Sequence, residues 1–193
     1  MPTPSPATSA SLLDQARDRQ PAAWQRLVAL YTPLLHSWLT AAGLQPADRD
    51  DLSQRVLEIL VRQLPDFAHN GRPGAFRAWL RGITVNRLRM FWRSRPEGGG
   101  PDAERVLQQL EDPHSDLSRR WDREHDQHVA RHMLARIEPE FKPTTWRAFR
   151  LLVLDGREAE AVAAEVGLSL NAVFIAKSRV LRRLREEMTG LVP

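Results

Sequence analysis

The stretch from Ala159 to Val173 reads AEAVAAEVGLSLNAV and decides the fold prediction. A helix-turn-helix needs a small residue where its two helices cross, a left-handed turn residue four positions later, a cap for the second helix and a branched apolar residue behind it. These requirements are met in order by Ala163, Gly167, Ser169 and Val173. Because so short a pattern also occurs in plain helical bundles, a bundle without DNA binding stays open as the alternative for this stretch alone.

The helix expected from Leu170 to about Met188 favours DNA binding. Five basic residues and no acidic residue lie between Lys177 and Arg185. Base edges are met at the amino-terminal end of a recognition helix, where Asn171 and Ile175 share its polar face. The alternative is a solvated basic face. The residues that we expect at duplex DNA are Ser169, Asn171, Ile175, Lys177, Ser178, Arg179, Arg182 and Arg183.

Apolar residues recur at spacings of three and four along most of the remaining chain, and no period-two strand pattern of any length is present. The sequence therefore predicts an all-α protein. The further helices are expected between Ser11 and Gly43, from Pro46 to Leu64, from Phe76 to about Arg93, from about Ser118 to Ile137, from Thr144 to Leu154 and from Ala159 to Val166.

The composition changes abruptly at residues 96–101, which read PEGGGP and open a polar, largely acidic stretch. Such a run favours neither a helix nor a central strand. We therefore expect two small helical domains, residues 11–95 and 119–193, joined by a flexible acidic linker over 96–118. Residues 1–10 are expected to form a disordered tail, and a length of 193 residues suits two small domains.

A second nucleic-acid signal lies between Phe67 and Pro96, which carries seven arginines and no carboxylate. Aromatic residues are interleaved with these arginines, among them Phe76 and Trp79. Cations suit phosphates and aromatic rings suit unstacked bases, so the pattern is typical of single-strand binding. Two plainer alternatives are that Trp79 packs in the core and that the arginine face is merely solvated.

Charge and cysteine content narrow the function classes further. The formal net charge is only +4, yet 26 of the 28 basic residues are arginine, whose planar side chain suits phosphates and base edges. The chain has no cysteine, so thiolate catalysis and cysteine-bound zinc are excluded. No secretory signal and no apolar run of spanning length is present, so we expect a cytoplasmic protein without membrane insertion.

The enzyme alternatives find little support. His125, His128 and His132 share a helix face at metal-binding spacing, but a His-Glu-x-x-His pattern and a fourth ligand are missing, so solvent-facing histidines are the simpler interpretation. The glycines at 98–100 lack the Gly-Lys-Ser/Thr of a phosphate loop. We expect no enzymatic activity, no metal, no cofactor and no small-molecule substrate.

Three motifs in order now resemble a known family. These are DDLSQRV at 50–56, FRAWLRGITVN at 76–86 and the helix-turn-helix already described. Together they resemble a bacterial RNA polymerase sigma factor of the extracytoplasmic-function group, over residues 10–95 and 120–188. The resemblance implies that the chain binds core RNA polymerase, directs it to specific promoters and promotes strand opening. A stand-alone helix-turn-helix regulator, which binds duplex DNA without polymerase, is the alternative.

The resemblance also implies roles for particular residues. Core polymerase would be bound by Asp50, Asp51, Leu52 and Gln54, the alternative being an acidic helix start that packs only within its own domain. Melted promoter DNA would be bound by Phe67, Asn70, Arg72, Asn86, Arg87, Arg89 and Arg93. Similar proteins usually carry a basic residue where this chain has Phe174 and Ala176. The contacts to upstream bases are therefore the roles that carry over least well from the family to this chain. An anti-sigma protein is a further possible partner.

Overall fold

The computed structural model describes residues 11–67, 74–95, 100–189 and 191–192. Within this part of the chain every regular element is a helix, as predicted. The chain divides into two compact units, which are described one at a time. Of the described residues, the N-terminal unit comprises those from Ser11 to Val129 together with 189 and 191–192, and the C-terminal unit comprises Ala130–Met188.

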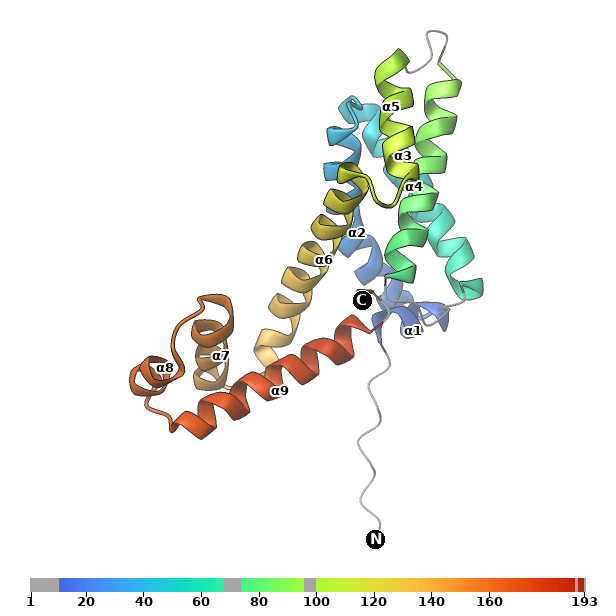
Figure 1. Cartoon of the computed structure of the whole chain (residues 1–193). Coiled ribbons are helices and arrows are strands. Elements are labelled where there is room, and N and C mark those ends of the chain that lie inside the picture. The colour runs from blue at the N-terminus through green and yellow to red at the C-terminus, as the bar shows by residue number, and fades with distance from the viewer. Residues whose placement is uncertain (1–10, 68–73, 96–99, 190, 193) are drawn as a thin grey trace. The chain divides into compact units, whose positions relative to one another are not determined.

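The N-terminal unit begins with three helices that the sequence predicts closely (Figure 1): α1 (Leu12–Arg17), α2 (Pro21–Ala41) and α3 (Pro46–Gln63). A capping box between Ser11 and Asp14 starts α1. Prolines start α2 and α3, where a missing backbone N–H costs nothing. A short 3₁₀ turn (Leu64–Asp66) follows α3, and α4 (Ala75–Arg93) completes the set.

The core of the N-terminal unit lies between α2, α3, α4 and the first half of α6 (Asp116–Ile137). Trp38 of α2 stacks on Trp121 of α6 with ring centroids 4.4 Å apart, and both rings are fully buried. The other large buried side chains on these helices include Leu27, Leu30, Tyr31, Leu35, Leu39, Leu60 and Phe76. Burial of this many apolar side chains fixes α6 to the unit.

The expected flexible linker over 96–118 is the main difference from the sequence analysis. Helix α5 (Gly100–Glu111) occupies most of it, and α6 begins at Asp116. The reason is an apolar stripe of Ala103, Leu107 and Leu110, which are all buried while the residues between them face solvent. The first half of α6 also belongs to the N-terminal unit, so the boundary lies after Val129 and not near 118.

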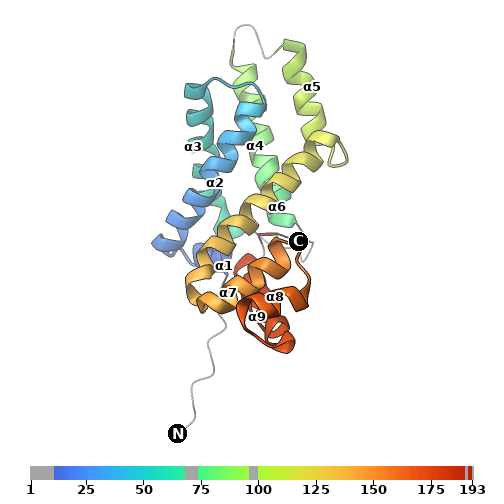
Figure 2. The ribbon, with the colours of Figure 1, turned by 90° about the vertical axis from the view of Figure 1, so that its left-hand side faces the viewer.

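The C-terminal unit holds the end of α6, a 3₁₀ turn (Glu138–Glu140), α7 (Pro143–Phe149), α8 (Ala159–Val166) and α9 (Leu170–Met188). Figure 1 shows the short helices α7 and α8 beside the longer α9, and Figure 2 shows the same three helices grouped together in a view turned by 90°. Gly167 ends α8 in the left-handed conformation at φ 67°, and α9 turns away from α8 by 99°. The Ser169 hydroxyl accepts a hydrogen bond from the Ala172 amide at 3.2 Å, which caps α9. The predicted helix-turn-helix is therefore present.

A π-helical segment (Arg150–Leu154) continues α7, and the core of the unit consists of two apolar clusters. Phe149 packs with Ile137 and Val180 in one cluster. Leu151, two residues later, packs in the other, which also contains Ala148, Val162, Val173 and Ala176. The adjacent residues Ala148 and Phe149 thus face different clusters from the end of α7.

Candidate polymerase and nucleic-acid interfaces

The acidic start of α3 is only partly on the surface. Asp50, Asp51 and Gln54 are exposed, whereas Leu52 is 3% exposed. Asp51 forms an ion pair with Arg55 one turn later at 2.9 Å. The expected docking group therefore presents three polar side chains, and Leu52 supports them from inside its own domain because it belongs to the buried stripe of α3.

Two faces of α4 divide the residues that were expected at melted DNA. Arg87 lies with Met90 and Phe91 beside α3, where they line a cleft of about 280 Å³ together with Asp51 and Leu52. Asn86 and Arg89 lie on the face toward α5 and line a second cleft, of about 320 Å³, with Leu110 and Glu111. Arg93 is exposed near the end of the helix. The structure therefore brings Asn86 and Arg89 together but separates Arg87 from them.

Phe67 lies in an aromatic cluster at the start of α4. Its ring stacks on Trp79 with centroids 4.6 Å apart and meets Phe76 edge-on at 5.8 Å. Phe76 is buried, whereas Phe67 and Trp79 are half-buried. The cluster combines core packing with partly accessible rings, so the core interpretation of Trp79 holds only in part. Asn70 and Arg72, which were expected to act beside Phe67, lie outside the described residues.

Two further arginines of α4 are engaged by carboxylates of α6. Arg77 pairs with Asp122 at 3.3 Å and also with Asp126. Arg81 pairs with Asp122 at 2.5 Å. Their guanidinium groups are largely buried, at 17% and 11% side-chain exposure, so a partner charge is required there. This part of the acid-free arginine stretch holds the domain together and is not a solvated face.

His125 corrects the expectation of solvent-facing histidines, because it is completely buried. Its Nδ1 lies 3.0 Å from the Asp126 carboxylate, which can only accept, so Nδ1 carries a proton. Its Nε2 lies 3.2 Å from the Tyr31 hydroxyl. Burial lowers the pKa of His125, although Asp126 opposes this shift. His128 meets the Leu30 carbonyl oxygen at 2.6 Å, so both histidines join α6 to α2.

The same buried network shifts the pKa values of Tyr31 and Asp126. Burial, followed by the nearby Asp126 charge, raises the pKa of Tyr31 well above its ordinary value. Burial also raises the pKa of Asp126, but hydrogen bonds from His125 and Arg77 outweigh it and leave the pKa below its ordinary value. The network is therefore neutral at Tyr31 and His125 and charged at Asp126 near neutral pH.

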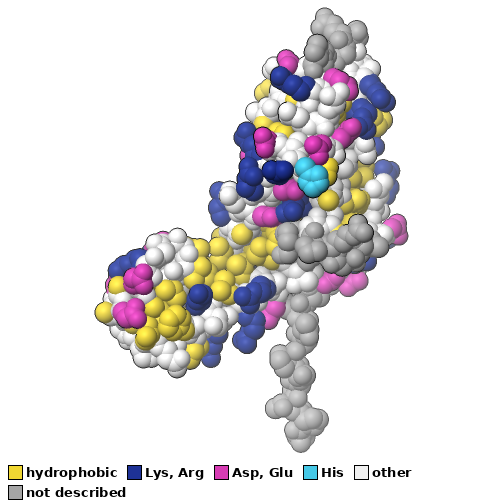
Figure 3. Space-filling view, in the orientation of Figure 1, with side chains coloured by type: hydrophobic (Ala, Val, Ile, Leu, Met, Phe, Trp, Pro, Cys, Tyr) yellow, Lys and Arg dark blue, Asp and Glu magenta, His cyan; other side chains and the backbone are white. Residues whose placement is uncertain are grey.

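The exposed face of α9 carries polar, apolar and basic side chains. Val173, Ala176 and Val180 are buried, as the helical spacing predicts. The residues exposed on the other side are Asn171, Phe174, Ile175, Ser178, Arg179 and Arg182, and Lys177 is half-buried. Phe174 and Ile175 are each 45% exposed, and exposed hydrophobic side chains are visible on this unit in Figure 3. Large apolar side chains at the start of a recognition helix suit thymine methyl groups.

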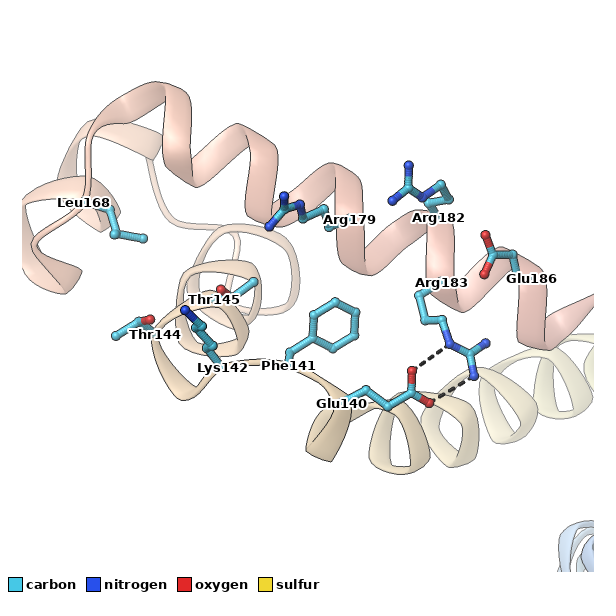
Figure 4. Close-up of a pocket in the computed structure, with 10 residues that line it drawn as sticks. All are labelled: Glu140, Phe141, Lys142, Thr144, Thr145, Leu168, Arg179, Arg182, Arg183 and Glu186. Carbon is cyan, nitrogen blue, oxygen red and sulfur yellow. Dashed lines mark hydrogen bonds and ion pairs between the residues drawn. The ribbon is translucent and has the colours of Figure 1, made fainter. Parts of the chain in front are cut away.

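Arg183, which was expected at duplex DNA, is held inside the C-terminal unit by two carboxylates. Its guanidinium donates to both Glu140 carboxylate oxygens, at 2.7 and 3.0 Å (Figure 4). It also donates to Glu187 at 2.9 Å. Hydrogen bonds to Glu140, followed by those to Glu187, raise the pKa of Arg183. The partners lie 43 residues away and one turn away, which the local charge pattern does not reveal. We therefore assign Arg183 to the fold.

A cleft of about 750 Å³ beside α9 adds residues that the sequence analysis did not select. Figure 4 shows Lys142 and Thr145, at the start of α7, on one side of this cleft and Arg179 and Arg182 of α9 on the other. Among the described residues neither Arg179 nor Arg182 has an ion-pair partner. Lys142 is one of only two lysines in the chain and directly precedes Pro143, the first residue of α7. A rare lysine just before a helix start was the feature of the sequence that could have identified it.

Residues 11–67, 74–95 and 100–189 contain no group of three histidine or acidic side chains that could hold a metal ion. No single helix there is long and apolar enough to cross a membrane, and only the bent pair α8 and α9 reaches that length and composition when taken together.

Comparison with known proteins gives one family match. Residues 27–96, which cover most of α2 and all of α3 and α4, match the sigma-70 region 2 family. A solved structure, that of CnrH in complex with the cytosolic domain of CnrY, is 24% identical over 90% of this chain and 92% of that chain, with a TM-score of 0.38. No curated protein matches the chain. The region that matches the family contains both the acidic start of α3 and the arginine-rich α4.

Proposed function

We propose that this chain is a sigma factor of the extracytoplasmic-function group, which binds core RNA polymerase, directs it to specific promoters and helps to open the DNA. The observation that carries the proposal is a sigma-70 region 2 at residues 27–96 followed, in the same chain, by a separate unit with a helix-turn-helix. The chain itself catalyses no reaction, needs no cofactor and acts in the cytoplasm.

The exposed start of α3 is the proposed polymerase-binding surface. Asp50, Asp51 and Gln54 offer carboxylate and amide groups on one stretch of helix without burying them in the domain. The double substitution Asp51→Arg with Gln54→Ala should weaken binding of core polymerase while leaving the helix content unchanged. Unaltered pull-down of core polymerase by this variant would refute the docking assignment.

Helix α4 is the proposed surface for melted DNA. Asn86, Arg89 and Arg93 supply an amide and two cations along α4, and Phe67 and Trp79 supply accessible rings near its start. A surface that holds unstacked bases binds melted DNA better than duplex DNA, and only such a difference in affinity can drive opening. Substitution of Asn86 and Arg89 by alanine should therefore reduce permanganate-detected melting more than upstream duplex binding.

Helix α9 is the proposed duplex reader. Asn171, Phe174 and Ile175 would meet base edges, whereas Arg179 and Arg182, with Lys142 across the cleft, would hold phosphates. Because one chain carries both DNA-binding surfaces, contact with one promoter element raises the effective concentration of the other surface at the second element. An anti-sigma protein is a further proposed partner.

Co-purification with core polymerase, followed by transcription from a promoter library, tests the proposal as a whole. The expected result is a stable complex that initiates from a limited promoter set. A gel shift with and without core polymerase addresses the alternative regulator. Tight duplex binding by the chain alone, with no polymerase complex, would overturn the sigma-factor proposal.

A further inference from the structure

The Asn86 and Arg89 face of α4 is already occupied within the chain. Arg89 forms an ion pair with Glu111 at the end of α5, and it also donates to the Asn86 amide oxygen at 3.1 Å. Leu110 of α5 is 2% exposed and lines the same cleft as these two residues. Asn86 and Arg89, two of the α4 side chains that we assign to melted DNA, are therefore engaged by α5 or by each other.

The chemistry of this contact matches that of the proposed ligand. A nucleic-acid strand would bring phosphate oxygens to Arg89, and Glu111 brings carboxylate oxygens to the same guanidinium. One anion can take the place of the other without leaving a buried charge unpaired. The Arg89 side chain is 30% exposed in the paired state, so a competing anion can approach it.

Helix α5 is held less firmly than the neighbouring half of α6. The α6 segment places Trp121, His125 and Val129 in the core, all at 1% exposure or less. Helix α5 has 12 residues, and α4 is its main packing partner. Isolated helices of this length are marginal in water, so α5 depends on that one surface. Opening of α5 is therefore expected to need much less free energy than opening of α6.

The far end of α5 is anchored at its connection to α6. The Ser118 hydroxyl lies 3.0 Å from the Gln109 carbonyl oxygen and 3.2 Å from that of Leu110. Residues 112–115 form the short connection between the two helices. Release of Glu111 and Leu110 from α4 would thus leave α5 tethered beside the face that it covered.

We propose that α5 is an internal cap on the strand-binding face of α4, and that melted promoter DNA displaces it by competing with Glu111 for Arg89. The inference rests on the proposed role of α4 in strand binding. It adds that α5 lowers the affinity of the free chain for single-stranded DNA. The strength of the contact between α5 and α4 then determines how readily a single strand binds.

The first test compares two charge-removing variants of the full chain on one helix. Glu111→Gln removes the carboxylate that pairs with Arg89. Glu104→Gln removes the same charge from an exposed α5 position, which within the described part of the chain is bonded to Gln108 of the same helix alone. Binding of a fluorescent pool of short random single-stranded DNA should strengthen about two- to fivefold in Glu111→Gln, which is the range for loss of one partly exposed ion pair. Glu104→Gln should change it much less.

Equal gains in both variants would show a general charge effect, and no gain in Glu111→Gln would show that the contact does not compete with DNA. Either result overturns the cap but leaves the sigma-factor proposal standing, because polymerase binding and promoter opening by the holoenzyme are measured separately. Failure of the holoenzyme to open any promoter would instead overturn the proposed function.

Hydrogen exchange of the full chain gives a second test that does not depend on a variant. Addition of the same DNA pool should speed amide exchange in α5 while Trp121 and its neighbours in α6 stay protected. Unchanged or slower exchange in α5 upon binding would overturn the cap, because a displaced helix loses the packing that protects its amides.

Discussion

The arginines of α4 and those of α9 arise from similar sequence patterns but are used differently. In α4, Arg77, Arg81 and Arg89 each pair with a carboxylate of α5 or α6. In α9, Arg179 and Arg182 have no ion-pair partner among the described residues, whereas the neighbouring Arg183 is held by Glu140 and Glu187. An arginine-rich stretch therefore identifies a surface able to bind anions, and the tertiary partners decide whether that surface is available.

The largest expected effect tests whether α6 is an integral part of the N-terminal unit. Trp121→Ala removes a buried ring that stacks on Trp38 and should lower the free energy of unfolding by about 3–5 kcal/mol. Chemical denaturation followed by circular dichroism measures the loss. A change below about 1 kcal/mol would mean that α6 is only loosely attached, since surface substitutions typically fall in that range.

The next prediction concerns the paired arginines of α4. Asp122→Asn leaves Arg77 and Arg81 without their shared carboxylate and should destabilise the unit by about 1–3 kcal/mol. Asp102→Asn is the matched control, because its pair with Arg105 is exposed and lies within one turn of α5. Equal stability of the two variants in denaturation would contradict the structural role of the α4 arginines.

A base-reading role for α9 predicts a local loss of specificity. An asparagine can bond an adenine edge with both its amide groups, so Asn171→Ala should cost about 1–3 kcal/mol at one upstream base pair and little elsewhere. The measurement is holoenzyme affinity for a set of upstream-element variants. An unchanged sequence preference would show that Asn171 does not reach the bases.

The buried histidine predicts a pH dependence of the N-terminal unit. Burial lowers the pKa of His125, so the unfolded chain takes up the proton first as the pH falls below 6.5. The contribution of neutral His125 to the free energy of unfolding is therefore present in full above that pH. Below it the contribution decreases, by at most about 1.4 kcal/mol per pH unit for one proton. His125→Gln should flatten the slope of unfolding free energy between neutral and mildly acidic pH. A wild-type slope retained in the variant would assign the effect to another group.

The smallest expected effect separates two adjacent arginines of α9. Arg182→Ala should lower affinity about uniformly across sequences and reduce the slope of log affinity against log salt by about 1, because one phosphate contact is lost. Arg183→Ala should leave that slope unchanged and instead lower stability, because Glu140 loses its partner and the buried Glu187 keeps only its pair with Arg136 among the described residues. The reverse pattern would exchange the two roles.

Local patterns predicted the helix-turn-helix well. The roles of its residues depend on partners only a few positions away in the sequence, so their spacing alone defines these roles. They are the turn at Gly167, the cap at Ser169 and the core residue Val173. Helix α5 was not predicted, because the glycines and prolines before it and its acidic residues indicated a linker. Its apolar stripe of Ala103, Leu107 and Leu110 is short. A stripe of three residues is weak evidence until the surface that it packs on is known.

Partners distant in sequence account for the other differences. His125 lies among polar residues in the sequence, and its burial depends on Tyr31, which is 94 positions away. Arg183 likewise depends on Glu140. Which residues of α4 face α3 and which face α5 also depends on how these three helices pack, and the sequence of α4 alone does not reveal this. The residue types of the candidate site were therefore predictable, but their availability to DNA was not.

The π-helical segment at Arg150–Leu154 holds one residue more than an α-helix would place along the same path. Loss of one residue inside this segment would therefore restore ordinary α-helical geometry and leave the later side chains close to their present directions. Loss of one residue from the regular helix before it, Pro143–Phe149, would instead rotate the side chains on the two sides of the deletion by about 100° relative to one another. Natural variants are therefore expected to tolerate a single-residue deletion within Arg150–Leu154 better than one within Pro143–Phe149.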